Sequence, residues 1–273
     1  MKHPLLGILA ILPMLCAPQA ALAKKEMAEA AVHLEQVPAA LQADAAYILV
    51  KASVAKSGLF AIQHVLLREP SEQELADYLA AKQIAYEAEL PKLRKKAKDG
   101  PVPTIGEFQF DYKGKPNSFV VRVGKFLEDG EMRTILLQVP PGKYILYGVT
   151  VGDRGLASCN CLGTVGFTAQ PGVITHLGSL YADKVHKESP VPNLEDELGE
   201  QMFQYSFVLG GALVPADAQT AVPAAIQKMP ISPAKLEVIG QFYEPGAGNI
   251  NRLAPIPGIL GYERGKPVDL RGK

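Results

Sequence analysis

Short runs of apolar and β-branched residues, separated by turn residues, dominate the chain between Met132 and Leu180. Residues 135–139 and 144–151 are two such runs, and Pro140-Pro141-Gly142-Lys143 lies between them. Proline fixes a negative φ and glycine accepts a positive one, so Pro141 and Gly142 predict the centre of a type II turn. Two β-rich runs around such a turn predict a β-hairpin.

The same arrangement recurs farther along the chain, where Gln170-Pro171-Gly172-Val173 separates residues 164–168 from residues 173–177. Gly152-Asp153-Arg154-Gly155 predicts another turn, and Gly178-Ser179-Leu180 is expected to end the β-rich region. Turn signals at this spacing are typical of β-sandwiches and barrels.

Two earlier apolar runs, residues 47–54 and 59–67, predict the first strands, with Ser57-Gly58 as the turn between them. His64 lies inside the second run. A single histidine in such a place is expected to be a packed or edge residue rather than a ligand.

Residues 71–98 carry the clearest helical pattern in the chain. Ser71 followed by Glu74 predicts a capping box, in which the two side chains satisfy each other's backbone N–H groups. Pro91 is expected to kink or divide the helix near its end. An apolar stripe follows the helical period at Leu75, Leu79, Tyr86, Leu90 and Leu93.

After this helix the chain returns to a β pattern and then becomes irregular. Residues 105–112 alternate large and polar side chains, and Glu128-Asp129-Gly130 is a hairpin turn signal. From Ala212 onward Pro, Ala and Gly dominate, and residues 236–242 and 259–262 are strand-like. We therefore expect an extended C-terminal segment that packs over a sandwich.

The resulting fold class is α+β, mainly β: an antiparallel β-sandwich over residues 46–180 with a helical insertion at about 71–98. Residues 24–45 are expected to form a linker or short helix. Residues 181–273 are expected to form a C-terminal extension, with a short helix at 195–207.

The first 23 residues predict a secretory signal peptide. Lys2 and His3 precede an apolar core, and Ala21-Leu22-Ala23 is a small-x-small cleavage site, which would leave a mature chain starting at Lys24. The expected location is periplasmic or extracellular. The alternative is a lipid anchor through Cys16, although Leu15 is not the small residue that such processing requires before the cysteine.

Charge and composition exclude some classes of partner. The chain has 28 Lys and Arg against 28 Asp and Glu and contains no Trp, which argues against a dedicated nucleic-acid binder. No run after the signal peptide approaches the length of about 20 apolar residues that a membrane-spanning helix needs. A partner is therefore expected to be an envelope protein or surface, without a cofactor.

Cys159-Asn160-Cys161 is the best candidate for site chemistry. Cysteines in an oxidising compartment normally pair, but residues i and i+2 of a strand lie at or beyond the Cα limit of a disulfide. A bond would therefore require Asn160 to sit in a turn. Free or intermolecularly paired thiols, a redox pair and a metal site that adds His176 remain open, although the spacing is shorter than in usual zinc motifs.

A second candidate site is the cluster of cations at the predicted helix end, which is formed by Lys92, Arg94, Lys95, Lys96 and Lys98. Cations at a helix C-terminus complement the helix dipole, so a solvated helix end explains them. The sharper hypothesis is peripheral contact with anionic lipid head groups.

No catalytic motif is present: the chain lacks a nucleophile elbow, a P-loop, an HExxH helix and an EF-hand loop. The first hypothesis is a noncatalytic envelope module that binds a protein or surface. The alternative is a thiol-redox or metal-handling protein that uses Cys159 and Cys161, and a hydrolase with scattered acids remains a third.

The run ILLQVPPGKYILYGV, followed by CNCLGTVGFTAQPGVITHLGSL, resembles a group of uncharacterised exported bacterial proteins. Their domains carry a PPGxY turn and a later PG…LG strand, in the style of DUF2846-like and carboxypeptidase-regulatory-like (prealbumin-like) domains. The resemblance implies a β-sandwich at the cell envelope. It carries over no catalytic residue.

Overall fold

A computed structural model describes most of the chain. The described residues are 32–34, 36–53, 56–57, 60–98, 100–113, 117–122, 127–129, 132–152, 156–184, 209–242 and 250–272. The predicted signal peptide, Cys16 and the predicted helix at 195–207 lie outside them.

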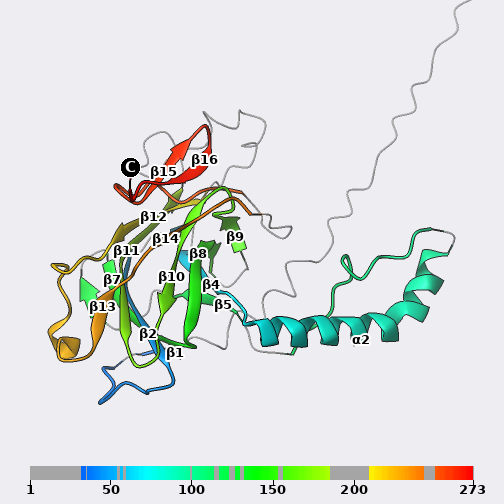
Figure 1. Ribbon diagram of the computed structural model, residues 1–273, viewed down its shortest axis with the longest axis horizontal. Coiled ribbons are helices and arrows are strands. Elements are labelled where there is room, and N and C mark those ends of the chain that lie inside the picture. The colour runs from blue at the N-terminus through cyan, green and yellow to red at the C-terminus, as the bar shows by residue number, and fades with distance from the viewer. Residues whose placement is uncertain are drawn as a thin grey trace, which may run out of the picture.

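Two β-sheets stack face to face and form a sandwich-like body, which confirms the predicted α+β, mainly β class (Figure 1). Within the described residues, the first sheet has seven strands in the order β1-β7-β2-β11-β12, with β6 beside β7 and β13 beside β11. Its strands are β1 (Val32–His33), β2 (Ala46–Ser53), β6 (Leu127–Asp129), β7 (Met132–Val139), β11 (Ile174–Lys184), β12 (Leu209–Pro215) and β13 (Ile231–Pro233).

The second sheet also has seven described strands, in the order β14-β10-β8-β4-β3, with β5 beside β4 and β9 beside β8. Its strands are β3 (Lys56–Ser57), β4 (Phe60–Arg68), β5 (Ser118–Val121), β8 (Gly142–Val151), β9 (Leu156–Cys159), β10 (Thr164–Ala169) and β14 (Glu237–Ile239). A separate hairpin of β15 (Leu260–Glu263) and β16 (Lys266–Asp269) lies near the C-terminus.

The main core lies between the sheets. Ile48 and Leu137 enter it from the first sheet, and Leu146 and Phe167 enter it from the second. Strand β2 is buried on both faces, because Tyr47 and its neighbours on the outer side belong to a second apolar cluster.

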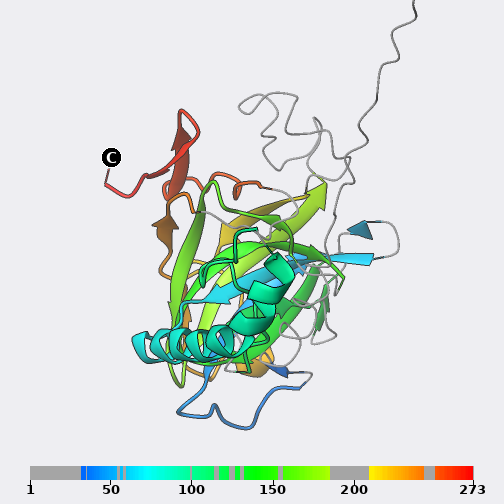
Figure 2. The same ribbon diagram turned by 90° about the vertical axis from the view of Figure 1, so that its right-hand side faces the viewer.

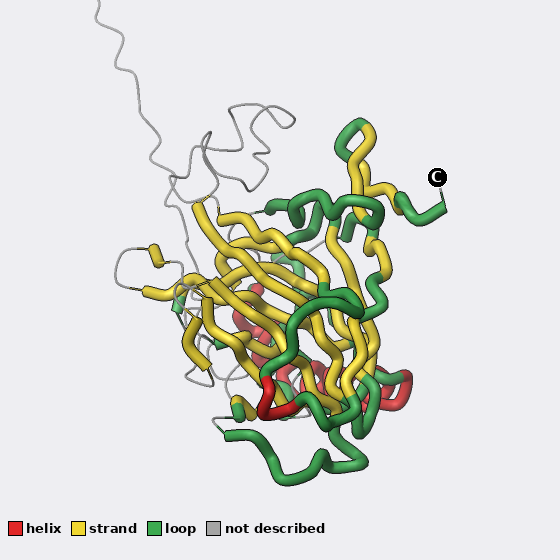
Figure 3. Tube along the Cα trace, turned by 90° about the vertical axis from the view of Figure 1, so that its left-hand side faces the viewer, coloured by secondary structure: helices red, strands yellow, loops and turns green. Residues whose placement is uncertain are grey.

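The second cluster is covered by Leu34, by residues 36–41 and by residues 222–231. The last segment includes the short 3₁₀ helix η3 (Ala224–Ile226). Figure 3 shows the segment that carries η3 crossing the outer face of the first sheet. This double burial explains why β2 is an apolar run without the polar alternation of a half-exposed strand.

The predicted hairpin around Pro140-Pro141-Gly142-Lys143 is wrong. Strand β7 pairs with β1, β2 and β6 in the first sheet, whereas β8 pairs with β4, β9 and β10 in the second. The Pro-Pro-Gly sequence is therefore a corner at which the chain crosses the core. The Tyr144 hydroxyl donates a 2.6 Å hydrogen bond back to the Pro140 carbonyl and holds this corner, much as the tyrosine corner does in other sandwiches.

The second predicted hairpin, around Gln170-Pro171-Gly172-Val173, is wrong for the same reason. Strand β10 belongs to the second sheet and β11 to the first. Gly172 has a φ of 69°, as a type II turn requires, so the turn chemistry is present but it joins two layers. Local turn residues do not reveal which sheet a buried strand will join.

Other predicted turns do lie inside hairpins. Strand β8 pairs antiparallel with β9 on either side of the predicted turn at 152–155. Strand β6 pairs with β7, with Asp129 opposite Met132. Strand β11 continues past the predicted end at Leu180 as far as Lys184, and it pairs with β12 along its second half.

Helix α2 (Glu72–Ala97) begins where the capping box predicts. The Glu74 N–H donates to Ser71 Oγ over 3.2 Å, and the Ser71 N–H donates to Glu74 Oε2 over 2.8 Å. The helix continues through Pro91 and bends in its last turns, so the predicted kink is present (Figure 1). It points away from the sandwich instead of packing on it.

Candidate functional site

The helix belongs to a long insertion in a β-hairpin. Strands β4 and β5 pair antiparallel with Leu67 opposite Ser118, and the Arg68 N–H donates to the Asn117 carbonyl over 2.7 Å. The two ends of the inserted segment therefore meet at one point of the second sheet. We call residues 70–113 the arm; it consists of α2 and the strand-free return segment 100–113.

Aromatic side chains hold the return segment against the helix. The ring of Tyr78 lies 5.7 Å from that of Phe110 and 5.2 Å from that of Tyr112. Farther out, the rings of Tyr86 and Phe108 are 5.4 Å apart. The alternation of residues 105–112 therefore does not mark a sheet strand. It places Phe108, Phe110 and Tyr112 on the side that faces α2.

Two polar contacts fix the same pairing. The Tyr86 hydroxyl donates to the Pro103 carbonyl over 2.9 Å, and Lys82 Nζ donates to the Gly106 carbonyl over 3.2 Å. Edge-to-face aromatic pairs contribute about 0.5–1.5 kcal/mol beyond their buried area. Contacts within the arm therefore hold α2 and the return segment together, without packing against the core of the sandwich.

An ion pair fixes the base of the arm. Arg68 Nη2 on β4 lies 2.8 Å from Glu74 Oε1 in the first turn of α2, and the Arg68 side chain is buried. The side-chain hydrogen bond from Arg68 and the backbone hydrogen bond from Ser71 lower the pKa of Glu74 to about 2. Glu74 is therefore ionised across the physiological range.

The arm exposes apolar residues. None of the residues of α2 is fully buried. Tyr86, Leu90 and Leu93 of the predicted stripe are half-buried. Leu75 and Leu79 near the base are 47% and 55% exposed, and Ile84 is 69% exposed. The return segment covers only part of the stripe. Figure 2 shows the helix in front of the sheets.

The predicted cationic cluster occupies the far end of the arm. Arg94, Lys95 and Lys96 form the last helical turn and are exposed. Lys92 is also exposed and lies 2.7 Å from Glu89. This is the part of α2 most distant from the sandwich in Figure 1.

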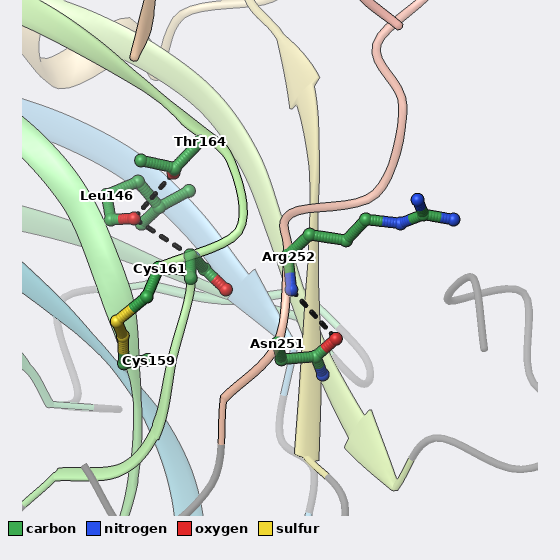
Figure 4. The surroundings of a disulfide bond; sticks show 7 residues. Leu146, Cys159, Cys161, Thr164, Asn251 and Arg252 are labelled. Atoms are coloured by element: carbon green, nitrogen blue, oxygen red, sulfur yellow. Dashed lines mark hydrogen bonds between the residues drawn. A yellow bond between two sulfur atoms is a disulfide. The ribbon is translucent and has the colours of Figure 1, made fainter. Parts of the chain in front are cut away.

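Cys159, the last residue of β9, and Cys161 in the turn that follows lie in contact, and the structure joins them as a disulfide (Figure 4). Their Cα atoms are 5.2 Å apart, within the normal range for such a bond, because β9 ends at Cys159 and a turn begins at Cys161. Asn160 is thus outside the strand, as pairing requires. Both cysteines are buried, with 0% and 2% of their surfaces exposed.

Hydrogen bonds satisfy the turn between the cysteines. Asn160 donates from its backbone N–H to the Tyr147 carbonyl over 2.8 Å and from Nδ2 to the Leu146 carbonyl over 3.0 Å. Thr164 Oγ1 donates to the same Leu146 carbonyl over 2.6 Å (Figure 4). Two acceptor lone pairs of one carbonyl thus hold both ends of the turn.

A C-terminal segment covers this turn from outside. The Asn251 N–H donates to the Cys159 carbonyl over 2.8 Å, and the Phe242 N–H donates to the Cys161 carbonyl over 2.9 Å. The Phe242 ring stacks on that of Tyr147 at 6.0 Å. The cysteine pair is therefore enclosed on several sides.

His176 does not join the cysteines. It is buried on β11 in the other sheet, and burial, with a smaller effect of Lys51, lowers its pKa. Across the described part of the chain, no three His, Cys, Asp or Glu side chains gather as metal ligands would. The metal alternative therefore has no assembled site among these residues.

His64 is a packed residue, as expected, but its environment is unusual. It is 2% exposed, lies against Gly211 of β12, and neither ring nitrogen makes a hydrogen bond of normal geometry. Burial lowers its pKa to about 4, and the nearby Tyr181 backbone opposes this shift only in part.

Among the described residues, α2 and the other helical segments are too short or too polar to cross a membrane. Comparisons of the chain with protein-family models, with curated proteins and with solved structures found no match.

Proposed function

We propose that this chain is an exported, noncatalytic envelope module whose binding element is the arm. One observation carries the proposal: an ordered insertion within the β4–β5 hairpin leaves the sandwich and buries no residue of its helix in the core. Connections in such hairpins are usually two to five residues long, and much longer ones are commonly functional.

The arm has the properties of a presented surface. Its shape is fixed internally by aromatic pairs and at its base by the Arg68–Glu74 ion pair. Its exposed apolar residues, Leu75, Leu79 and Ile84, cost free energy in water unless something covers them. A rigid scaffold that carries a protruding loop is a common plan for recognition.

The proposal is tested by photocrosslinking in the cells that produce the protein. A photoreactive phenylalanine analogue replaces Ile84 on the arm, and in a matched control it replaces Lys228, which is exposed on the covering segment of the sandwich. The proposal predicts discrete adducts to envelope components from position 84 and none from position 228. Equal labelling at both positions, or adducts only to cytoplasmic proteins, would contradict it.

Export itself is tested by intact mass. A purified chain that starts at Lys24 supports cleavage of residues 1–23, and a chain that starts at an acylated Cys16 supports the lipid-anchored alternative. A chain that retains Met1 contradicts both.

The alternative, a thiol-redox role for Cys159 and Cys161, receives less support. Thiol exchange requires access of an attacking thiolate to a sulfur atom, whereas both residues are buried under Phe242 and Asn251. The pairing instead supports a structural role for the bond.

A further inference from the structure

We propose that the tip of the arm, defined as Lys92, Arg94, Lys95, Lys96 and Lys98, contacts an anionic phospholipid surface. This inference rests on the proposed function, because it names the partner of one part of the arm.

Charge is segregated along the helix. Glu72, Glu74 and Asp77 lie in its first two turns, and the last acidic residue of the helix is Glu89. Residues 90–98 contain five cations and no acid. Cations in the last turn complement the helix dipole, but that effect falls off within the turn and does not account for Lys92.

The cations surround the last turns of the helix except along one half-buried stripe. Leu90, Leu93 and Ala97 are half-buried and recur at the spacing of one helical face. Positions 92, 94, 95 and 96 therefore spread over the wide remaining arc, which faces solvent, and the exposed Lys98 follows as the helix C-cap. A broad convex arc of long cationic side chains does not form a pocket for one small anion. It matches an extended anionic surface.

The tip is electrostatically separate from the body of the protein. From Glu72 to Lys92 the helix rises about 30 Å, at about 1.5 Å per residue. Charges farther apart than a Debye length of about 8 Å are largely screened at physiological ionic strength. The balanced charge of the whole chain therefore does not cancel the positive potential at the tip.

A membrane fits these features better than a nucleic acid does. Residues 90–98 contain no aromatic side chain on which a base could stack, whereas a membrane needs only a local patch of cations. Clustered Lys and Arg near an anionic leaflet each contribute about a fivefold increase in binding. The bend after Pro91 lets the last turns run at an angle to the rest of the helix (Figure 1).

The test is co-sedimentation of the full protein, purified from its producing cells, with phospholipid vesicles. One vesicle is pure phosphatidylcholine, and the other contains about one third phosphatidylglycerol, an order-of-magnitude match to an anionic leaflet. The tip variant carries Arg94→Gln, Lys95→Gln and Lys96→Gln, since glutamine keeps helix propensity. The control carries Lys228→Gln, Lys235→Gln and Lys266→Gln, which remove the same charge from exposed positions outside the arm.

The proposal predicts binding to the anionic vesicles only, weakened about a hundredfold in the tip variant and little changed in the control. Raising the salt from about 0.1 M to about 1 M shortens the Debye length to about 3 Å and should release the wild-type protein. Equal weakening in the tip variant and the control would overturn the assignment. So would displacement by a DNA duplex at equal phosphate concentration.

The experiments distinguish failure of this inference from failure of the proposed function. If the wild-type chain ignores anionic vesicles while position 84 still crosslinks to an envelope protein, the tip assignment is wrong and the arm remains a binding element. If neither contact is found, both fail.

Discussion

Arg68 Nη2 and Glu74 Oε1 lie 2.8 Å apart and join the two parts of this molecule, since Arg68 ends strand β4 of the sandwich and Glu74 lies in the first turn of the arm helix. The same carboxylate closes the capping box with Ser71. One side chain therefore both starts the helix and sets where it leaves the sheet.

Glu74→Gln is expected to loosen the base of the arm and leave the sandwich intact. The substitution removes the negative charge that pairs with Arg68 and weakens the capping box. Together these changes should destabilise the base of the arm by about 1 kcal/mol. Hydrogen exchange should then become roughly fivefold faster in the first turns of α2. Glu87→Gln, on an exposed turn farther out, is the matched control. Faster exchange throughout β4 and β8 would contradict the prediction.

Acid should weaken the same contact. The pKa of Glu74 is lowered from 4.5 to about 2, so its ionised form stabilises the contact fully above pH 4.5. The stabilisation is lost as the pH falls from about 4.5 to about 2. Protection of the first α2 turns in the wild type should therefore approach that of Glu74→Gln near pH 2, and a difference that persists there would refute this assignment.

His64 predicts a second acid effect, this time on the whole sandwich. Its pKa is lowered from 6.5 to about 4, so the unfolded chain binds a proton more readily than the folded chain. The contribution of neutral His64 to the free energy of unfolding is fully present above pH 6.5. The free energy of unfolding falls by up to about 3 kcal/mol as the pH drops toward 4. Denaturant unfolding of His64→Leu should show a shallower loss over this range. Parallel curves for the two proteins would contradict the prediction.

Replacement of Gly178 by any residue with a side chain is expected to destabilise the protein. It lies at a register shift between β11 and β2 with a φ of 105°, and an added Cβ would be 2.1 Å from the Val214 carbonyl oxygen. Gly178→Ala should lower the unfolding free energy by about 3 kcal/mol. Gly240→Ala is the control, because a Cβ there meets nothing within 4 Å and should change stability by less than about 0.5 kcal/mol. Similar effects at the two positions would show that the packing around β11 is looser than described.

Substitution of the two cysteines distinguishes a structural role of the disulfide from a redox role. Cys159→Ala combined with Cys161→Ala should lower the unfolding free energy by about 2 kcal/mol, since the bond closes a very short loop, and should leave envelope binding unchanged. Stability is measured by chemical denaturation and binding by recovery in the envelope fraction. Loss of binding at unchanged stability would favour the redox or metal alternative.

Local chemistry in the sequence predicts local structure well in this chain. Ser71 and Glu74 place the start of the helix because both halves of a capping box are encoded within four residues. Cys159 and Cys161 could be assigned only conditionally, because pairing depended on whether Asn160 would leave the strand.

The global arrangement is less accessible from sequence. Pro141 and Gly172 do mark turns, yet each turn joins different sheets, because partner choice for a buried strand depends on packing across the whole core. The direction of the arm does not follow from the helical stripe that Leu75 and Leu79 continue, because such a stripe does not say what will cover it. A signal was present in the gap between Leu79 and Tyr86, where Lys82 occupies the stripe, and a polar residue there is unsuited to a sandwich core.

The most direct test of the account is excision of the arm. Residues 70–116 are replaced by an Asn-Gly turn that joins Glu69 to Asn117. The two ends are already close, because the Arg68 N–H donates to the Asn117 carbonyl over 2.7 Å. Arg68→Met accompanies the excision, because its charge would otherwise lose its partner.

The measured quantity is recovery of the excised chain in the envelope fraction, with its thermal midpoint as the control for folding. The account predicts a midpoint within about 4 °C of the wild type, because the helix contributes nothing to the core, together with loss of envelope recovery. A chain that fails to fold, or one that folds and is still recovered like the wild type, would contradict the claim that the arm is a separable binding element.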